Sequence, residues 1–271
     1  MSKIKVKATV SNLLAKIVAI KPAGKEYSWL RLVLVDKSID LFGKCLNCHI
    51  NNQGNTLEGI VLKCAADQFR VDALFKVSAE FFEDKVFEDN KNKENYSFTI
   101  KNSDFNSELL DKFYEINDPS RLDSRYHLIL VPKASLLMGL ALALAYSDQD
   151  QQVLAKTLFL FECDQLPLAI RPSLRVIKGV PNYVIGNFQM LEDCGIAARI
   201  ACINEEIGCY EGNLLSMFNE YVSYYLKHYS ADNLMITLLP SASAPLQERL
   251  GMFNVRPINK IALRHLKCNT Q

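Results

Sequence analysis

An excess of charge of one sign is missing from this sequence. The chain has 31 lysine and arginine residues against 30 aspartate and glutamate residues, so its formal net charge is only +1. Dedicated nucleic-acid binders carry a marked positive excess, and we therefore expect no nucleic-acid partner. The polar bias of a disordered chain is missing as well, because 49% of the residues are hydrophobic. With 271 residues the chain can form one large domain or two ordinary ones.

Long apolar runs are also missing. The first ten residues, MSKIKVKATV, alternate lysine with apolar residues and lack the continuous apolar core of a signal peptide, so export is not expected. The most apolar segment, 136–146, is about half as long as the roughly 20 residues that a membrane-spanning helix needs. These features predict a cytoplasmic protein without membrane insertion.

Metal-binding patterns are scarce. Eight cysteines are scattered along the chain, and without an export signal we expect reduced thiols. Cys45, Cys48 and His49 have the C-x-x-C-H spacing of a c-type haem site. In a strand, however, this odd separation places the two sulfurs on opposite faces. No second cysteine pair has the spacing of a zinc site, and the four histidines are isolated in the sequence. We predict no metal site and no catalytic residue.

The central feature that is present is the stretch 126–146, YHLILVPKASLLMGLALALAY. Its apolar run 127–131 predicts a strand buried on both faces, and the segment after Pro132 and Lys133 predicts a helix. Such a strand–helix pair begins a βαβ unit, and ligands bind at the carboxyl ends of its strands. The loop 132–135 is therefore the first place to look for chemistry, although it contains no glycine.

The N-terminal third shows short alternating apolar runs that are broken by turn residues. This pattern predicts a small antiparallel β-barrel over 1–106. Its expected strands are 4–8, 13–20, 29–35, 45–50, 59–64, 74–79 and 97–100. The charged segment 80–95 reads as a surface loop, but it contains Phe81, Phe82 and Phe87. Exposed apolar side chains mark partner sites, so these three phenylalanines are candidates for partner docking.

The remainder alternates strands with helices, which predicts an α/β domain with a mainly parallel sheet over 124–271. A connector helix and loop over 107–123 precede it. The expected strands are 127–131, 158–162, 174–177, 198–203, 234–239 and 260–266. The expected helices are 136–146, 181–192, 213–229 and 245–250.

This layout, a barrel followed by a nucleotide-type α/β domain, resembles the ferredoxin–NADP reductase superfamily. Locally the chain is similar to the electron-transfer subunit of dihydroorotate dehydrogenase and its relatives. The similarity is carried by LFLFECDQLPLAIRPS (158–173), VIKGVPNYVIGNFQMLEDCGIAARIAC (176–202), GCYEGNLLSMFNEYV (208–222) and NKIALRHLKCN (259–269). The resemblance implies a ferredoxin reductase-like fold in which a flavin and a nicotinamide nucleotide bind.

The motifs that serve those cofactors in the family are replaced here. Residues 1–125 contain no R-x-Y-S/T flavin motif, and Val131-Pro132-Lys133-Ala134-Ser135 stands where the family has its glycine-rich nucleotide turn. The family's Cys-Gly-x-x-x-Met turn corresponds to 239–243. Of the four cysteines that hold a [2Fe–2S] cluster in the electron-transfer subunits, only Cys268 remains.

These departures lead to the hypothesis of a non-catalytic, cofactor-free scaffold or adaptor in a bacterial protein assembly, with other protein subunits as partners. A secretion-system coupling complex is one candidate assembly. On this hypothesis Pro132, Lys133, Ser135, Ser241 and Ser243 line a vestigial cleft, although the serines and the lysine could also bind an anion. The alternative is an NAD(P)-dependent oxidoreductase that binds FAD or FMN in a non-standard way. A nucleotide sensor without redox activity is a third possibility.

Overall fold

The computed structural model describes residues 12–24, 27–34, 45–50, 55–64, 70–76, 96–100, 126–147, 151–239 and 242–251. The chain divides into two compact units, Met1–Lys112 and Phe113–Gln271, which are considered separately. Several expectations lie outside the described residues. They are the strands 4–8 and 260–266, the connector 107–123, and the three phenylalanines of the segment 80–95.

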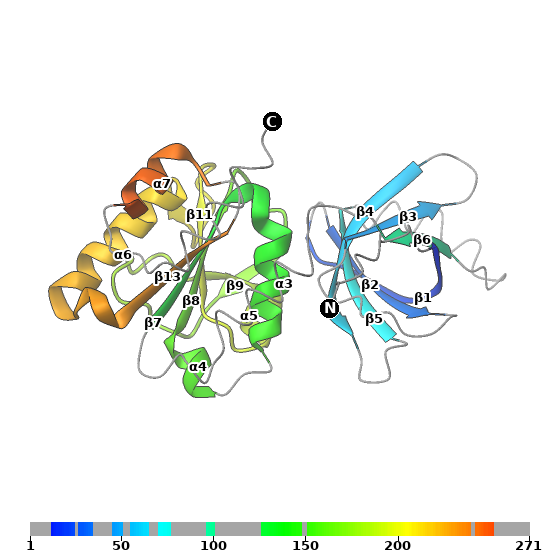
Figure 1. Ribbon diagram of the computed structural model, residues 1–271, viewed down its shortest axis with the longest axis horizontal. Coiled ribbons are helices and arrows are strands. Elements are labelled where there is room, and N and C mark those ends of the chain that lie inside the picture. Colours follow the sequence, from blue (N-terminus) through cyan, green and yellow to red (C-terminus); the bar gives the residue numbers. More distant parts are fainter. Residues whose placement is uncertain are drawn as a thin grey trace, which may run out of the picture. The chain divides into compact units, whose positions relative to one another are not determined.

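Unit 1 contains a closed antiparallel barrel with the strand order β1-β2-β5-β4-β3-β6 (Figure 1). The predicted barrel is thus confirmed. Alternation along β2 explains its two faces, because Leu30 and Leu32 are buried whereas Arg31 between them is exposed. Arg31 pairs across the sheet with Asp72 on β5, at 2.7 Å from Nε to Oδ1. The strands are β1 (Asn12–Pro22), β2 (Tyr27–Leu34), β3 (Cys45–Ile50), β4 (Asn55–Cys64), β5 (Arg70–Lys76) and β6 (Tyr96–Ile100).

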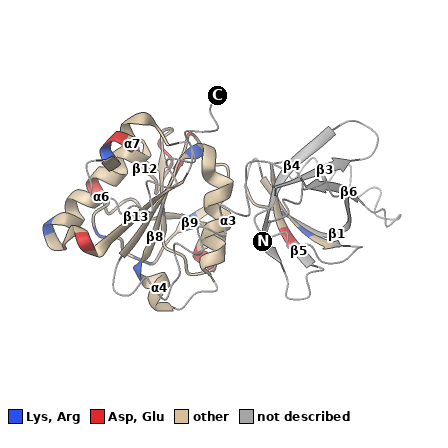
Figure 2. Ribbon diagram, viewed as in Figure 1, with Lys and Arg blue, Asp and Glu red and all other residues tan. Residues whose placement is uncertain are grey.

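Unit 2 is built on a five-stranded parallel sheet with the order β12-β11-β8-β7-β13, which confirms the predicted α/β class. The inner strand β7, which lies between β8 and β13, is buried on both faces, as its continuous apolar run predicts. Figure 2 shows that the strands of this sheet carry few charged residues. The strands are β7 (Tyr126–Val131), β8 (Thr157–Cys163), β11 (Ala198–Cys202), β12 (Tyr210–Glu211) and β13 (Leu234–Leu238).

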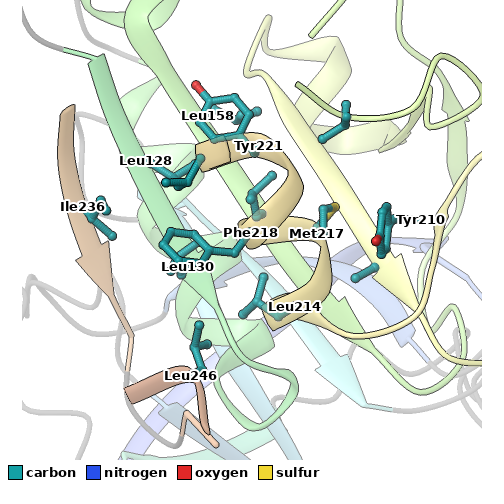
Figure 3. Packing of buried hydrophobic residues seen from close by; sticks show 14 of the residues in the cluster. Leu128, Leu130, Leu158, Tyr210, Leu214, Met217, Phe218, Tyr221, Ile236 and Leu246 are labelled. Carbon is teal, nitrogen blue, oxygen red and sulfur yellow. The ribbon is translucent and has the colours of Figure 1, made fainter. Parts of the chain in front are cut away.

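Helices cover both faces of this sheet. Helix α6 packs on one face, where Leu214, Phe218 and Tyr221 contact the even-numbered leucines of β7 and β8 (Figure 3). Helix α3 lies against the other face, at Val131 and Phe161. No helix in the described part of the chain combines the length and apolarity needed to cross a membrane. The helices are η2 (Lys133–Ser135), α3 (Leu136–Tyr146), α4 (Gln151–Lys156), α5 (Gln189–Asp193), α6 (Leu214–His228), η3 (Ala231–Asn233) and α7 (Ala244–Gly251).

The segment between β8 and β11 differs from its prediction. The expected strand 174–177 is a loop in which Leu174 is 96% exposed. Its backbone is held from the side, because the buried guanidinium of Arg199 on β11 donates to the carbonyl oxygen of Arg175. The expected helix 181–192 is also wrong. Residues 181–185 form a loop, and residues 186–188 form strand β10 (Gly186–Phe188), which pairs antiparallel with β9 (Ile170–Pro172). Helix α5 begins only at Gln189.

Gly139 allows helix α3 to approach the sheet closely. A Cβ atom at this position would clash with Val131 and would lie 2.9 Å from Cε1 of Phe161. Real Cβ contacts are not this short, so the neighbouring side chains or the helix would have to move. The contact between α3 and the two central strands therefore requires glycine.

Overpacking a core usually costs about 1–3 kcal/mol, and the gain of alanine over glycine in helix propensity offsets about 1 kcal/mol of this cost. We therefore expect Gly139→Ala to lower the free energy of unfolding by up to about 2 kcal/mol. Denaturant unfolding measures the change. Gly251→Ala is the matched control, because nothing lies within 4 Å of its added Cβ. Equal stability of the two variants would contradict the packing argument.

A buried hydrogen-bonded triad links β7, α3 and β13. The imidazole of His127 lies 2.9 Å from Thr237 Oγ1 through Nε2 and 3.2 Å from the Tyr146 hydroxyl through Nδ1. Burial lowers the pKa of His127 to about 3. A neutral imidazole has one donor and one acceptor nitrogen, which suits two hydroxyl partners. The triad is thus a neutral structural element of the core.

This histidine makes the fold sensitive to acid. Unfolded histidine titrates at about 6.5, so between about 6.5 and about 3 the unfolded chain binds the extra proton and stability falls as the pH is lowered. The contribution of His127 is about 1.4 kcal/mol per pH unit. Urea unfolding at pH values of about 7 and about 5 should show a smaller acid loss for His127→Gln than for wild type. Equal losses would refute the assignment.

Candidate functional site

The order of the parallel strands creates a topological switch point between β7 and β13. From β7 the chain proceeds through β8 and β11 on one side and then returns to place β13 on the other side. Leu130 and Leu238 are paired in register, and the amide of Leu239 donates to the carbonyl oxygen of Leu130 at 3.0 Å. In open α/β sheets the ligand crevice lies outside the carboxyl ends of the strands at this point.

The structure brings two of the sequence-predicted segments to this edge of the sheet. Pro132, Lys133 and Ser135 follow β7 directly, and Ser243 follows the neighbouring strand β13. Lys133 and Ser243 are exposed, whereas Ser135 is buried. Ser241 lies outside the described residues. The segment after β7 therefore lies at the carboxyl edge of the sheet, beside the switch point.

The turn after β7 uses its own backbone amides. The amide of Ser135 donates to the carbonyl oxygen of Pro132 at 2.8 Å, and the amide of Leu136 donates to that of Lys133. Pro132 has no amide hydrogen to offer. A glycine-rich turn binds phosphate through free backbone amides, and Pro132, Ser135 and Leu136 have none to offer here.

The positive charge of the turn is paired with the end of the next strand. Lys133 Nζ lies 2.9 Å and 3.0 Å from the carboxylate oxygens of Asp164, which directly follows β8. The hydrogen bond to Asp164 raises the pKa of Lys133, and the charges of Asp164 and then Glu162 add to the effect. Both side chains of the pair are more than half exposed. Sequence reasoning identified Lys133 but missed Asp164, whose position at a strand end was the available signal.

The N-terminus of helix α6 is closed by groups of the protein itself. The amide of Leu214 donates to Glu162 Oε1 at 3.2 Å, and the amide of Ser216 donates to the Asn213 side chain at 2.9 Å. These bonds satisfy two of the amides that a helix leaves unpaired at its start. Helix α6 therefore offers this edge of the sheet fewer free donors for an anion.

Three buried thiols gather near the same edge. Cys163 ends β8, Cys202 ends β11 in register with it, and Cys209 precedes β12. Burial raises the pKa of all three thiols, that of Cys209 to about 12. They are thus protonated and unreactive at neutral pH. Among the described residues, no group of three or more His, Cys, Asp or Glu side chains could hold a metal ion.

We expect the described cysteines to differ sharply in reactivity. Cys194 is exposed, so it should react quickly with an aromatic disulfide reagent, whereas the buried thiols should react only after unfolding. Cys194→Ser should remove one equivalent of fast-reacting thiol from the native protein, and Cys202→Ala should leave the fast phase unchanged. A loss of fast thiol in the Cys202 variant would show that the edge is open to solvent.

The barrel and the parallel sheet with its switch point define a ferredoxin reductase-like fold, which confirms the predicted fold class. Solved structures share it. The ferredoxin reductase in carbazole 1,9a-dioxygenase matches with a TM-score of 0.54 at 12% identity, over 93% of this chain and 68% of its own. A flavohemoglobin from Malassezia yamatoensis with bound FAD and heme matches with a TM-score of 0.50 at 11% identity, over 90% of this chain and 57% of its own.

Comparisons of the sequence itself give no assignment: no protein-family model matches the chain, and no curated protein matches it. The structural matches share the fold that the sequence resemblance implies. They contradict the expectation of a non-catalytic scaffold without cofactors, because these proteins are a reductase and an FAD-containing flavohemoglobin.

Proposed function

We propose that this chain is a flavin- and NAD(P)-dependent electron-transfer oxidoreductase. The observation that carries the proposal is the combination of a closed antiparallel barrel with a parallel sheet whose switch point lies between β7 and β13. A nicotinamide nucleotide would bind at the carboxyl edge of that sheet. The flavin, FAD or FMN, would be held by unit 1.

The described residues fit a nicotinamide nucleotide through side chains rather than through backbone amides. Lys133 offers a charged donor beside the switch point, and Ser243 offers an exposed hydroxyl group after the neighbouring strand. Both residues lie at the carboxyl edge of the sheet, where side-chain donors can take the place of a glycine-rich turn.

Flavin binding would be non-standard in this protein. The R-x-Y-S/T motif is absent from residues 1–125. Arg31 on β2 is held by the carboxylate of Asp72 through two short contacts, 2.7 Å and 3.0 Å, and the Asp72 side chain is only 14% exposed, so this arginine exchanges its partner less readily than an ion pair at the surface does. A bound flavin would accept a hydride from the nicotinamide and release electrons to an acceptor. The protein would position the two cofactors and keep water from the reacting groups.

We further propose that the electrons pass to other protein subunits. The local similarity of 158–173, 176–202 and 208–222 to the electron-transfer subunit of dihydroorotate dehydrogenase supports a role as a subunit rather than as an independent enzyme. Phe81, Phe82 and Phe87 are the proposed docking residues, because phenylalanine is enriched at protein interfaces. They lie outside the described residues.

The proposal predicts that the protein purified from its native cell is yellow, with the visible absorption bands of a flavin in about a one-to-one ratio to the chain. Adding NADH or NADPH without oxygen should bleach these bands. Heat-denatured protein should release the flavin, which identifies it as FAD or FMN. A colourless protein that gains no flavin absorbance on incubation with FAD and FMN would overturn the proposal.

A further inference from the structure

Resting on the proposed function, we propose that Lys133 is the side chain that binds the pyrophosphate of the nicotinamide nucleotide, and that Asp164 competes with the nucleotide for Lys133. The ion pair between them would be the resting state of the site. Nucleotide binding would then exchange one anionic partner of Lys133 for another.

Position supports the exchange. Strands β7 and β8 are neighbours, and Val131 is paired in register with Phe161. Lys133 and Asp164 follow these two strands at the same edge of the sheet, next to the switch point. A pyrophosphate bound at this edge would therefore come within reach of the lysine ammonium group, which the carboxylate of Asp164 already holds at 2.9 Å.

The local backbone offers few donors to a phosphate. Pro132 has no amide hydrogen, and the amides of Ser135 and Leu136 already donate within the turn. A pyrophosphate at this edge would therefore gain more from a charged side chain than from these three positions of the backbone. Lys133 can supply that interaction as a point charge with three donors.

The resting ion pair is weak enough to be exchanged. The side chains of Lys133 and Asp164 are 55% and 57% exposed, and ion pairs at such exposure contribute little to stability. A pyrophosphate carries more negative charge than one carboxylate and accepts more hydrogen bonds, so it is the stronger partner for the ammonium group. Displaced Asp164 can be solvated at once, because it lies at the surface.

The negative charges near Lys133 determine whether Asp164→Asn strengthens or weakens nucleotide binding. Asp164 repels an incoming phosphate while it occupies the lysine, and Glu162 at the end of β8 adds a second negative charge that acts on Lys133. Neutralising Asp164 frees Lys133 and removes one repulsive charge. Asp164→Asn should therefore strengthen nucleotide binding, the opposite of what the loss of a ligand-contacting residue would do.

The test is equilibrium binding of NAD⁺ and of NADP⁺, which do not react with an oxidised flavin, to the full chain, followed by titration calorimetry, with inorganic pyrophosphate as a competitor. We expect Lys133→Met to weaken binding by about tenfold or more, and Lys133→Arg to keep it within about threefold. Asp164→Asn should tighten binding by about threefold to tenfold. In the Lys133→Met background Asp164→Asn should tighten binding clearly less than it does in wild type, because only the repulsion between the carboxylate and the phosphate is left to remove.

A matched control is the ion pair between Arg171 Nη1 and Asp193 Oδ1, at 2.7 Å, whose side chains are 44% and 52% exposed. Arg171→Met and Asp193→Asn should leave the nucleotide affinity unchanged. Thermal unfolding of every variant, with its midpoint within a few degrees of wild type, shows that the fold is intact.

The outcomes separate the two proposals. Wild type that binds neither nucleotide would overturn the proposed function, and this inference with it. Wild type that binds, with Lys133→Met unchanged, would overturn the inference alone. Weaker binding in Asp164→Asn would also overturn it, because Asp164 would then contact the nucleotide instead of competing with it.

Discussion

The parallel pairing of strand β7 on both of its edges is the constraint on which unit 2 depends. Leu128, Ile129, Leu130 and Val131 are fully buried, and β8 and β13 are bonded on either side of them. A strand in this position has no edge for water, so its backbone must be paired along its whole length. Its register therefore fixes where the chain leaves the sheet after β7, β8 and β13, and those exits form the candidate site.

Different helices cover the two faces of this sheet. Helix α6 covers the even-numbered side chains of β7 and β8 with an apolar face that includes Leu214, Phe218 and Val222 (Figure 3). Helix α3 covers the odd-numbered side chains and depends on Gly139 for its close approach. A glycine is therefore present at position 139, where helix α3 packs on the sheet. None is present in the turn 132–135 after β7.

Strong local signals predicted most of this framework. The run 127–131 and the helix 136–146 were predictable because each has a length and composition that fit one structure. The predicted strand over 174–177 is wrong because Arg199, which is distant in the sequence, donates to the backbone of this segment and holds it in a loop. The pairing of Lys133 with Asp164 and the gathering of Cys163, Cys202 and Cys209 depend on register, which apolar periodicity does not specify.

The missing motifs led to the wrong functional hypothesis for a physical reason. A glycine-rich turn is only one way of binding a charged cofactor. The sequence-based hypothesis took the absence of such motifs as evidence that no cofactor binds. The fold still brings Lys133 to the switch point, and the same charge can be neutralised by a side chain as by a row of amides. Loop residues can change without disturbing the buried strands that place them. The charged side chains that the fold brings to the sheet edge are therefore a better guide to this site than the presence or absence of a motif.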